Sequence, residues 1–440
     1  MNFILNNKFK IIFLSFIILI SFYRSPYIFL EGRFMGEEGS HYFKNAYENG
    51  FLNQLLYFVP AAGYYNLIAN LLTELSTYVP LIYSPLVTAY GSLLIILIPL
   101  FLILFNESYL FKNDKEKFIG CLIFFITGPH IAEIWANSVN SQIYLFFASL
   151  LILYLKPENK KNQILFPGLL LISGLSAIYS CILTPLFFFK YLYTKSRKDL
   201  FNSIVLIVCS LIQGTLIFYS KFMGQLYSSV TNTLLETNSV VSPNMDKIIN
   251  FFYNFFAKPI IGRKPVYFIY ENFGLKSLGA SLGQTSMLLL FILLFIIILS
   301  LLIKSRFIQF CLKDHIFKSL VLVYILVFMV VIFGADNAQT SGRYTAIPGV
   351  LFLIKIYYLA TNFPSKIFSK FFSILIVISI ISGIYEFRPS TKNVRVQYIK
   401  YLDCIDCPRW KSDVEKWKKD ENSFLHVWPY PNKRFKLVQN

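Results

Sequence analysis

Two adjacent glutamates and a histidine follow closely behind the first apolar segment of the chain. Glu37, Glu38 and His41 all occur within the stretch Gly36-Glu37-Glu38-Gly39-Ser40-His41-Tyr42. A carboxylate at this place could take a proton from a hydroxyl nucleophile, and a carboxylate pair could hold a divalent cation. Acidic residues also suit the first turn of a helix, where they complement the helix dipole. The residues alone leave a catalytic base, a cation site and a plain helix N-terminus open.

A second polar group comes between the third and fourth apolar segments. His130 and Glu133 are three residues apart, so they can share one face of a helix. Trp135, Asn137 and Asn140 follow directly. Ionisable residues at the edge of a membrane span usually face a cavity or a partner. The pattern therefore indicates either a substrate site or a simple pair between the histidine and the glutamate.

Cations mark two further places. Arg343 and Tyr344 open a late apolar segment, where a guanidinium group suits a phosphate or could reach lipid head groups. Lys258, Arg263 and Lys264 lie among Tyr and Phe residues of a long loop and could contact a lipid phosphate. Both places are candidate phosphate contacts on a membrane-bound substrate.

The elements that must position these residues are membrane helices. Hydrophobic residues make up 56% of the 440-residue chain and charged residues only 15%, whereas soluble domains are about 25% charged. The mean hydropathy of +0.57 excludes an ordinary soluble enzyme and also a disordered chain. The net charge of +18 is therefore interpreted by its location along the chain, and nucleic acid is not an expected partner.

Eleven stretches are apolar enough to be spans, since a hydrocarbon core of about 30 Å takes about 20 residues to cross. They are Ile11–Phe29, Leu81–Phe105, Phe118–Ile134, Ser141–Leu155, Ile164–Ala177, Cys181–Tyr193, Leu200–Tyr219, Met287–Ile303, Ile316–Phe333, Ala346–Ala360 and Phe371–Tyr385. The excess of Lys and Arg in alternate loops puts the N-terminus in the cytoplasm. We expect an all-α polytopic membrane protein with about 11 transmembrane helices. Interfacial helices are expected at Glu37–Phe58 and Tyr64–Thr77 of the first external loop.

This arrangement predicts a membrane domain over residues 1–386, with long external segments at 31–80 and 220–286. Residues 387–440 are expected to form a small external tail packed around its tryptophans. Cys404 and Cys407 of the tail lack the two further ligands that zinc needs, so no metal site is predicted there, and a local disulfide or two free thiols both fit. The chain has no Walker motif and no Gly-rich dinucleotide loop.

Several of these features together resemble the GT-C superfamily of polytopic glycosyltransferases, which take sugars from polyprenyl-phosphate carriers. The features are the acidic Glu37-Glu38 motif in the first external loop, the short helix pair over 167–185, and Gly342-Arg343-Tyr344 followed by Pro348. The likeness covers most of residues 1–386 in layout. The chain departs from the family in carrying Glu-Glu for the usual Asp-Glu or Asp-Asp. It also lacks the large soluble C-terminal domain of oligosaccharyltransferases.

The resemblance implies transfer of a sugar, with inversion, from a polyprenyl-phosphate donor to a hydroxyl of a cell-envelope glycan or lipid. The reaction would take place on the periplasmic face of a bacterial inner membrane, among membrane lipids. Glu37 or Glu38 would be the catalytic base. The substrate contacts would be His41, His130, Glu133, Lys264, Arg343 and Tyr344. No cofactor is required by the resemblance, although a divalent cation could bind.

Two other readings stay open. A transporter or flippase of lipid-linked sugars would have ionisable groups near the bilayer midplane. In this sequence such groups gather at the outer ends of the spans, which favours surface chemistry. A non-catalytic envelope assembly protein would make Glu37, Glu38 and Arg343 each dispensable.

Overall fold

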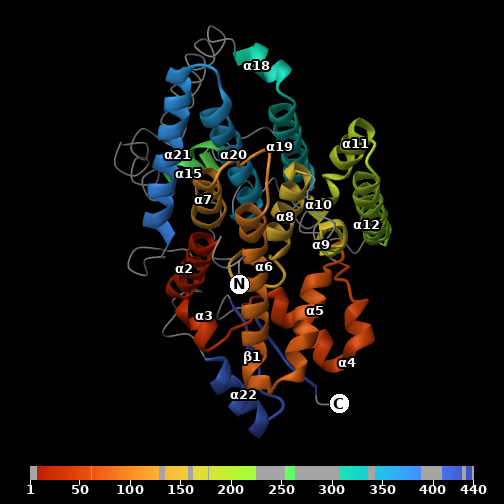
Figure 1. Ribbon diagram of the computed structural model, residues 1–440. Coiled ribbons are helices and arrows are strands. Elements are labelled where there is room, and N and C mark those ends of the chain that lie inside the picture. The colour runs from red at the N-terminus through yellow and green to blue at the C-terminus, as the bar shows by residue number, and fades with distance from the viewer. Residues whose placement is uncertain are drawn as a thin grey trace, which may run out of the picture. The chain divides into compact units, whose positions relative to one another are not determined.

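The computed structural model describes residues 7–60, 62–127, 134–156, 162–176, 178–223, 253–262, 307–334, 342–387, 409–428 and 433–438 (Figure 1). It is mostly helical, at 79%. The chain divides into two compact units. The first contains residues 1–121, 131–228 and 388–440, and the second contains 122–130 and 229–387. Each unit is described by itself.

The first unit holds the N-terminal helices, the loop of residues 31–80 and the C-terminal tail. Its elements are α2 (Lys8–Arg24), α3 (Pro26–Leu30), η1 (Glu38–Phe43), α4 (Lys44–Leu55), α5 (Leu67–Leu75), η2 (Ser76–Tyr78), η3 (Leu81–Tyr83), α6 (Ser84–Phe105), α7 (Asp114–Leu122), α8 (Gln142–Tyr154), α9 (Asn162–Ser176), α10 (Ile178–Cys181), α11 (Thr184–Thr194), α12 (Arg197–Phe222), α22 (Trp410–Lys419), β1 (Leu425–His426) and β2 (Arg434–Phe435). The helix α6 packs on α8, α8 on α9, and α9 on α12.

The second unit is built around two long apolar helices. Its elements are η4 (Ile123–Thr127), η6 (Tyr253–Ala257), α15 (Lys258–Ile261), α18 (Phe307–Lys313), α19 (His315–Gly334), η8 (Gly342–Thr345), α20 (Ala346–Asn362) and α21 (Lys366–Phe387). The helix α20 packs on α21 and α19. Asp314 lies at the bend between α18 and α19, where it accepts hydrogen bonds from Phe317 N and from the Tyr358 hydroxyl.

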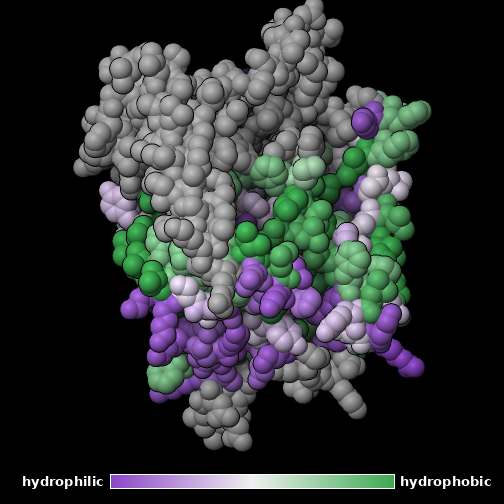
Figure 2. Space-filling model, turned by 90° about the horizontal axis from the view of Figure 1, so that it is seen from above, coloured by the Kyte–Doolittle hydropathy of each residue, from purple (hydrophilic) through white to green (hydrophobic). Residues whose placement is uncertain are grey.

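Within the described residues, four helical segments are long and apolar enough to cross a membrane: Leu81–Phe105, Arg197–Phe222, Arg343–Asn362 and Lys366–Phe387. The bent pair of α18 and α19, with an angle of 89°, makes five if it is one span. These helices are compatible with an all-α membrane protein. Each predicted span contains a helix except Met287–Ile303, which lies outside the described residues. Figure 2 shows apolar and polar side chains in separate areas of the described surface.

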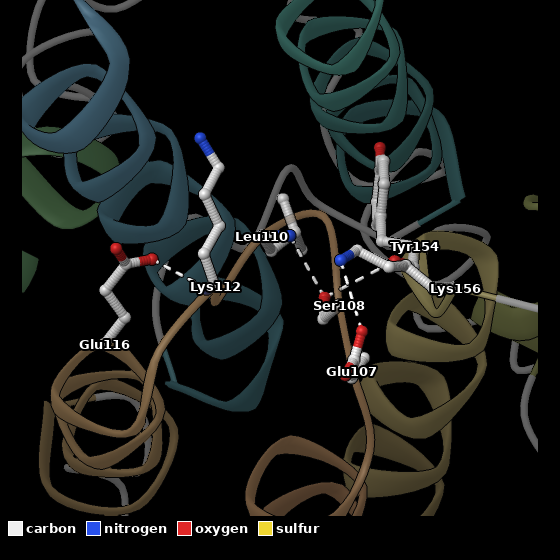
Figure 3. A network of polar contacts seen from close by, with 7 residues as sticks. All are labelled: Glu107, Ser108, Leu110, Lys112, Glu116, Tyr154 and Lys156. Carbon is white, nitrogen blue, oxygen red and sulfur yellow. Dashed lines mark hydrogen bonds and ion pairs between the residues drawn. The ribbon is translucent and has the colours of Figure 1, made fainter. Parts of the chain in front are cut away.

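A polar network joins the end of α6 to the end of α8 (Figure 3). Ser108 forms an antiparallel bridge with Leu155, and Lys156 N donates to the Glu107 carbonyl at 3.0 Å. The Lys156 ammonium lies 3.2 Å from the Glu107 carboxylate. This ion pair is exposed, so it adds little stability. The backbone bonds instead hold α6 and α8 as neighbours, which matters because the residues just before α8 contribute to the site described below.

Residues 31–80, the predicted first external loop, form helices at the places that the sequence predicts. The segment Glu37–Phe58 contains η1 and α4, and Tyr64–Thr77 contains α5. At the start of α5 the Asn66 side chain accepts a hydrogen bond from Ala69 N at 3.2 Å, a capping bond that stabilises a helix N-terminus. The start of α5 is therefore marked in the sequence by its Asn cap.

The C-terminal tail packs onto this loop. Trp410, Val414 and Trp417 recur at helical spacing on the buried face of α22. They form one hydrophobic core with Phe34, Phe43, Leu425, Val427, Phe435 and Leu437. The Trp410 indole Nε1 donates to the Leu81 carbonyl at 2.9 Å, so the tail also contacts the residues that lead into α6.

Candidate functional site

The turn before the two glutamates is held by the tail. Gly36 has a φ of +39°, a left-handed conformation that glycine adopts without steric cost. Its amide donates to the Trp428 carbonyl at 2.6 Å, and the Trp428 amide donates to the Phe34 carbonyl at 3.0 Å. Met35 and Trp428 form a parallel bridge. The residues leading to Glu37 thus lie as a short strand against the last part of the chain.

The π-helix η1 that follows is anchored on two sides. Tyr42 is buried in a cluster with Val59, Ala69 and Val139, whereas Phe43 belongs to the tail core and stacks on Phe34 at 4.5 Å between ring centroids. Packing on both sides fixes the rotation of η1 about its axis. The directions of Glu37, Glu38 and His41 are therefore set by the surrounding core.

Glu38 is buried and accepts hydrogen bonds from two separate parts of the chain. Only 1% of its surface is exposed. Its Oε1 accepts hydrogen bonds from Ser138 N at 2.8 Å and from Ser138 Oγ at 2.6 Å, and its Oε2 accepts one from Met35 N at 3.1 Å. Burial raises the pKa of Glu38, and the hydrogen bonds from Ser138 and Met35 oppose that rise. Glu38 thereby ties the start of η1 to the turn before α8.

Glu37 has the opposite environment. Its side chain is half-buried, and within the described residues it makes no hydrogen bond and no ion pair. His41 is also half-buried and lies four residues further along the same helical turn, the spacing at which side chains are neighbours on a helix surface. Within the part of the chain that the structure describes, Glu37 and His41 are thus the ionisable groups of this motif that a substrate could reach.

The turn that presents Ser138 to Glu38 is built by three residues of the second polar group. The Asn137 side chain accepts from Val139 N at 2.9 Å and from Asn140 N at 3.2 Å. Trp135 is fully buried and donates through Nε1 to Ser25 Oγ at 2.8 Å. Trp135, Asn137 and Asn140 therefore fix the turn that carries Ser138, the hydrogen-bond donor to Glu38. Sequence reasoning missed Ser138, since a serine beside an apolar run carries no signal of its distant partner.

The Arg24 guanidinium contacts the same turn through the Trp135 ring. It is 3% exposed and lies 4.5 Å from the centroid of the Trp135 ring, close enough for a cation–π contact. The Arg24 side chain, at the C-terminal end of α2, thus stacks on the turn that supports Glu38.

The remaining predicted site residues lie elsewhere. Arg343 and Tyr344 belong to η8 of the second unit. There the Arg343 Nη2 donates to the Tyr344 hydroxyl at 3.4 Å and the guanidinium lies 5.3 Å from the Tyr344 ring centroid. His130, Glu133 and Lys264 lie outside the described residues. The structure therefore brings Glu37, Glu38 and His41 together in the first unit.

Among the described residues, no group of three or more His, Cys, Asp or Glu side chains could hold a metal ion. Cys404 and Cys407 lie outside those residues. The arrangement at Glu37 and Glu38 consists of one accessible carboxylate beside one buried, hydrogen-bonded carboxyl, which suits proton transfer by a single group.

Comparison of the chain with protein-family models, with curated proteins and with solved structures gives no match.

Proposed function

We propose that the protein is a membrane glycosyltransferase of the GT-C type, which moves a sugar from a polyprenyl-phosphate carrier to an acceptor hydroxyl. One observation carries the proposal. Of two adjacent glutamates in the first external loop, Glu38 is buried and hydrogen-bonded, whereas Glu37 is half-exposed and has no partner among the described residues. A rigid anchor next to an accessible carboxylate is what a general base on a hydroxyl requires.

In this reaction Glu37 accepts the proton of the acceptor hydroxyl. The acceptor oxygen forms a bond to the anomeric carbon with inversion, and the bond from that carbon to the phosphate oxygen breaks. The polyprenyl phosphate leaves with the electron pair of that bond. A positioned base of this kind typically contributes about 10²–10⁴-fold to the rate. Glu38 acts as a positioning residue through Ser138 and Met35, and His41 lies where it would contact a substrate.

The proposal includes the membrane arrangement. We propose about 11 spans, the N-terminus in the cytoplasm of a bacterial cell and the first external loop on the periplasmic side of the inner membrane. Arg343 and Tyr344 belong to η8, which directly precedes α20, and with Lys264 they would contact the lipid phosphate. His130 and Glu133 would line the acceptor side. A divalent cation, if one takes part, would bind at Glu37.

The test uses purified protein in nanodiscs supplied with polyprenyl-phosphate sugars and acceptor glycan. We expect wild-type protein to release polyprenyl phosphate and the Glu37→Gln variant to lose at least about 100-fold of that rate. The matched control is Glu31→Gln, which removes a partly exposed carboxylate of the same loop that faces Arg409 at 3.6 Å. Full activity of Glu37→Gln would remove Glu37 from the role of base.

A cellular measurement complements it. Mass spectrometry of lipid-linked sugars and surface glycan compares cells that carry wild-type protein, Glu37→Gln or a deletion, at matched membrane expression. A transferase predicts that the deletion and Glu37→Gln both accumulate one lipid-linked sugar and both lose one glycan residue. That residue then names the donor sugar.

The transport alternative is favoured by a different observation. Lys355 lies within α20, and its ammonium is 3.2 Å from the centroid of the Tyr324 ring. An ionisable residue within a span is a common sign of a substrate pathway. If the deletion alters the glycan and Glu37→Gln does not, a flippase for lipid-linked sugars is the better account. In that case Lys355→Met would abolish function.

A further inference from the structure

Three cations occur in and directly beside β2 (Arg434–Phe435) of the tail. Lys433, Arg434 and Lys436 are all exposed, whereas Phe435 and Leu437 are buried in the tail core. Side chains alternate between the two faces of a strand, so Arg434 and Lys436 lie on the face opposite to the buried pair. By the same alternation Lys433 lies on the other face, where its ammonium is beside Gly36. We call Lys433, Arg434 and Lys436 the basic strip.

The strip concentrates charge of one sign. The Arg434 guanidinium lies 4.2 Å, and the Lys436 ammonium 4.9 Å, from the centroid of the same ring, that of Phe424. Two like charges held at one aromatic face repel each other, and the attraction of each to the ring offsets part of that repulsion. None of the three cations has a carboxylate partner among the described residues. The strip is thus arranged for an anion that this part of the chain does not supply.

The strip also lies beside the candidate base. The strand β2 contacts η1. A Cβ placed on Gly36 would lie 3.3 Å from the Lys433 Nζ, and Gly36 immediately precedes Glu37. Lys433 therefore brings a positive charge to the turn that carries Glu37.

The position of the tail indicates which anion this is. The tail contacts the residues before α6 through Trp410 and lies with α3, α4 and α5 at one end of the first unit (Figure 1). Its tryptophans, Trp410, Trp417 and Trp428, are each only 2% exposed. Exposed Trp residues usually anchor a surface segment at a membrane interface, whereas here Trp410 and Trp417 lie in the tail core and Trp428 is buried beside Met35. The strip therefore fits a water-soluble anion better than lipid head groups.

We propose that the basic strip binds the phosphate groups of an anionic envelope glycan, and that this polymer is the acceptor. The acceptor role rests on the proposed transferase function, whereas binding of the polymer does not. Lys433 would hold the phosphate nearest to Glu37, and Arg434 and Lys436 would hold the next one along the chain. A guanidinium group and an ammonium group both suit phosphate oxygens.

The test measures binding of fluorescent poly(glycerol phosphate) to the full-length protein in phosphatidylcholine nanodiscs at low ionic strength. We expect the triple variant Lys433→Gln/Arg434→Gln/Lys436→Gln to bind about 10- to 100-fold more weakly than wild type. The matched control is Lys416→Gln/Lys418→Gln/Lys419→Gln, which removes the same charge from exposed positions of α22 in the same tail. We expect this control to bind within about twofold of wild type.

Each result decides between outcomes. Equal losses in the two triple variants would overturn the proposal in favour of nonspecific attraction to a basic tail. A strip variant that binds the polymer normally but loses binding to phosphatidylglycerol vesicles would overturn it in favour of a lipid surface. Glu37→Gln should bind the polymer like wild type even where transfer is lost. A failure of the proposed transfer reaction can therefore be distinguished from a failure of the basic strip to bind the polymer.

Discussion

Glu38→Gln tests whether the second glutamate is an anchor. The substitution keeps the size of the side chain but replaces one carboxyl oxygen by an NH₂ group, which donates and cannot accept. Glu38 Oε1 receives two donors from Ser138, and Oε2 receives Met35 N. The amide oxygen would keep the two bonds to Ser138, and the amide nitrogen would then face Met35 N–H.

The magnitude follows from this count. One buried backbone N–H would lose its acceptor, which costs about 1–3 kcal/mol. The neutral amide also avoids the cost of burying an ionised carboxylate, which raises the stability of the variant. We therefore expect Glu38→Gln to lower the free energy of unfolding by about 1–2 kcal/mol, near the lower end of that range. Glu37 has no hydrogen bond to lose among the described residues, so Glu37→Gln should change stability by less than about 0.5 kcal/mol.

The assay is thermal unfolding in nanodiscs, followed by tryptophan fluorescence, for wild type, Glu37→Gln, Glu38→Gln and the exposed control Glu415→Gln. We expect a lower Tm for Glu38→Gln alone. Transfer activity should show the reverse order, with Glu37→Gln the more damaging substitution. If Glu37→Gln lowers the Tm and Glu38→Gln does not, the assignment of anchor and base is reversed, and the account of this loop is wrong.

Two further predictions concern the same loop. Because burial raises the pKa of Glu38 above its ordinary value of 4.5, the folded state binds a proton more tightly than the unfolded state. The stability that Glu38 contributes should therefore be fully present below pH 4.5 and lost as the pH rises through the folded pKa. The measurement is the Tm of wild type minus the Tm of Glu38→Gln, which should fall as the pH rises over this range. A Tm difference that is independent of pH would contradict the burial of a titrating carboxyl. Gly39→Ala should destabilise the protein by about 1–3 kcal/mol, because a Cβ there would lie 2.5 Å from Val427 Cγ1 and 2.9 Å from Phe34 Cβ. Gly214→Ala, where nothing lies within 4 Å, is the control, and equal Tm values for the two variants would refute the close approach.

The apolar segments of this chain could be located from its sequence. The predicted span Leu81–Phe105 coincides with η3 and α6, because the run is continuously apolar and Pro80 precedes it. The loop helices were equally predictable from helical spacing and prolines. The number of spans could not be predicted in the same way. Whether α18 and α19 form one span depends on the 89° bend between them, and that bend depends on packing that hydropathy does not describe.

The distinction between Glu37 and Glu38 could not be drawn from the sequence. It depends on Ser138, which is 100 residues away from Glu38, and on a tail that bonds to the loop from the other end of the chain. Adjacent residues of one type have the same local propensities, so only their distant partners separate them. The predicted packing of the tail around its tryptophans left out Phe34 and Phe43, which complete that core.

The pairing of the first loop with the tail also determines when the site can form during synthesis. Glu48 of the loop region accepts a hydrogen bond from the Val438 amide, 390 residues later. The Gly36 amide likewise donates to the carbonyl of Trp428, which is also made late in synthesis. At a translation rate of about 5–20 residues per second, the loop exists for about 20–80 s before its partner strand is made. Until then Gly36 and Phe34 lack the backbone partners that shape the turn. The Glu37 turn therefore stays unfinished while the helices between it and the tail are made, and it is completed only when residues 428–438 are present.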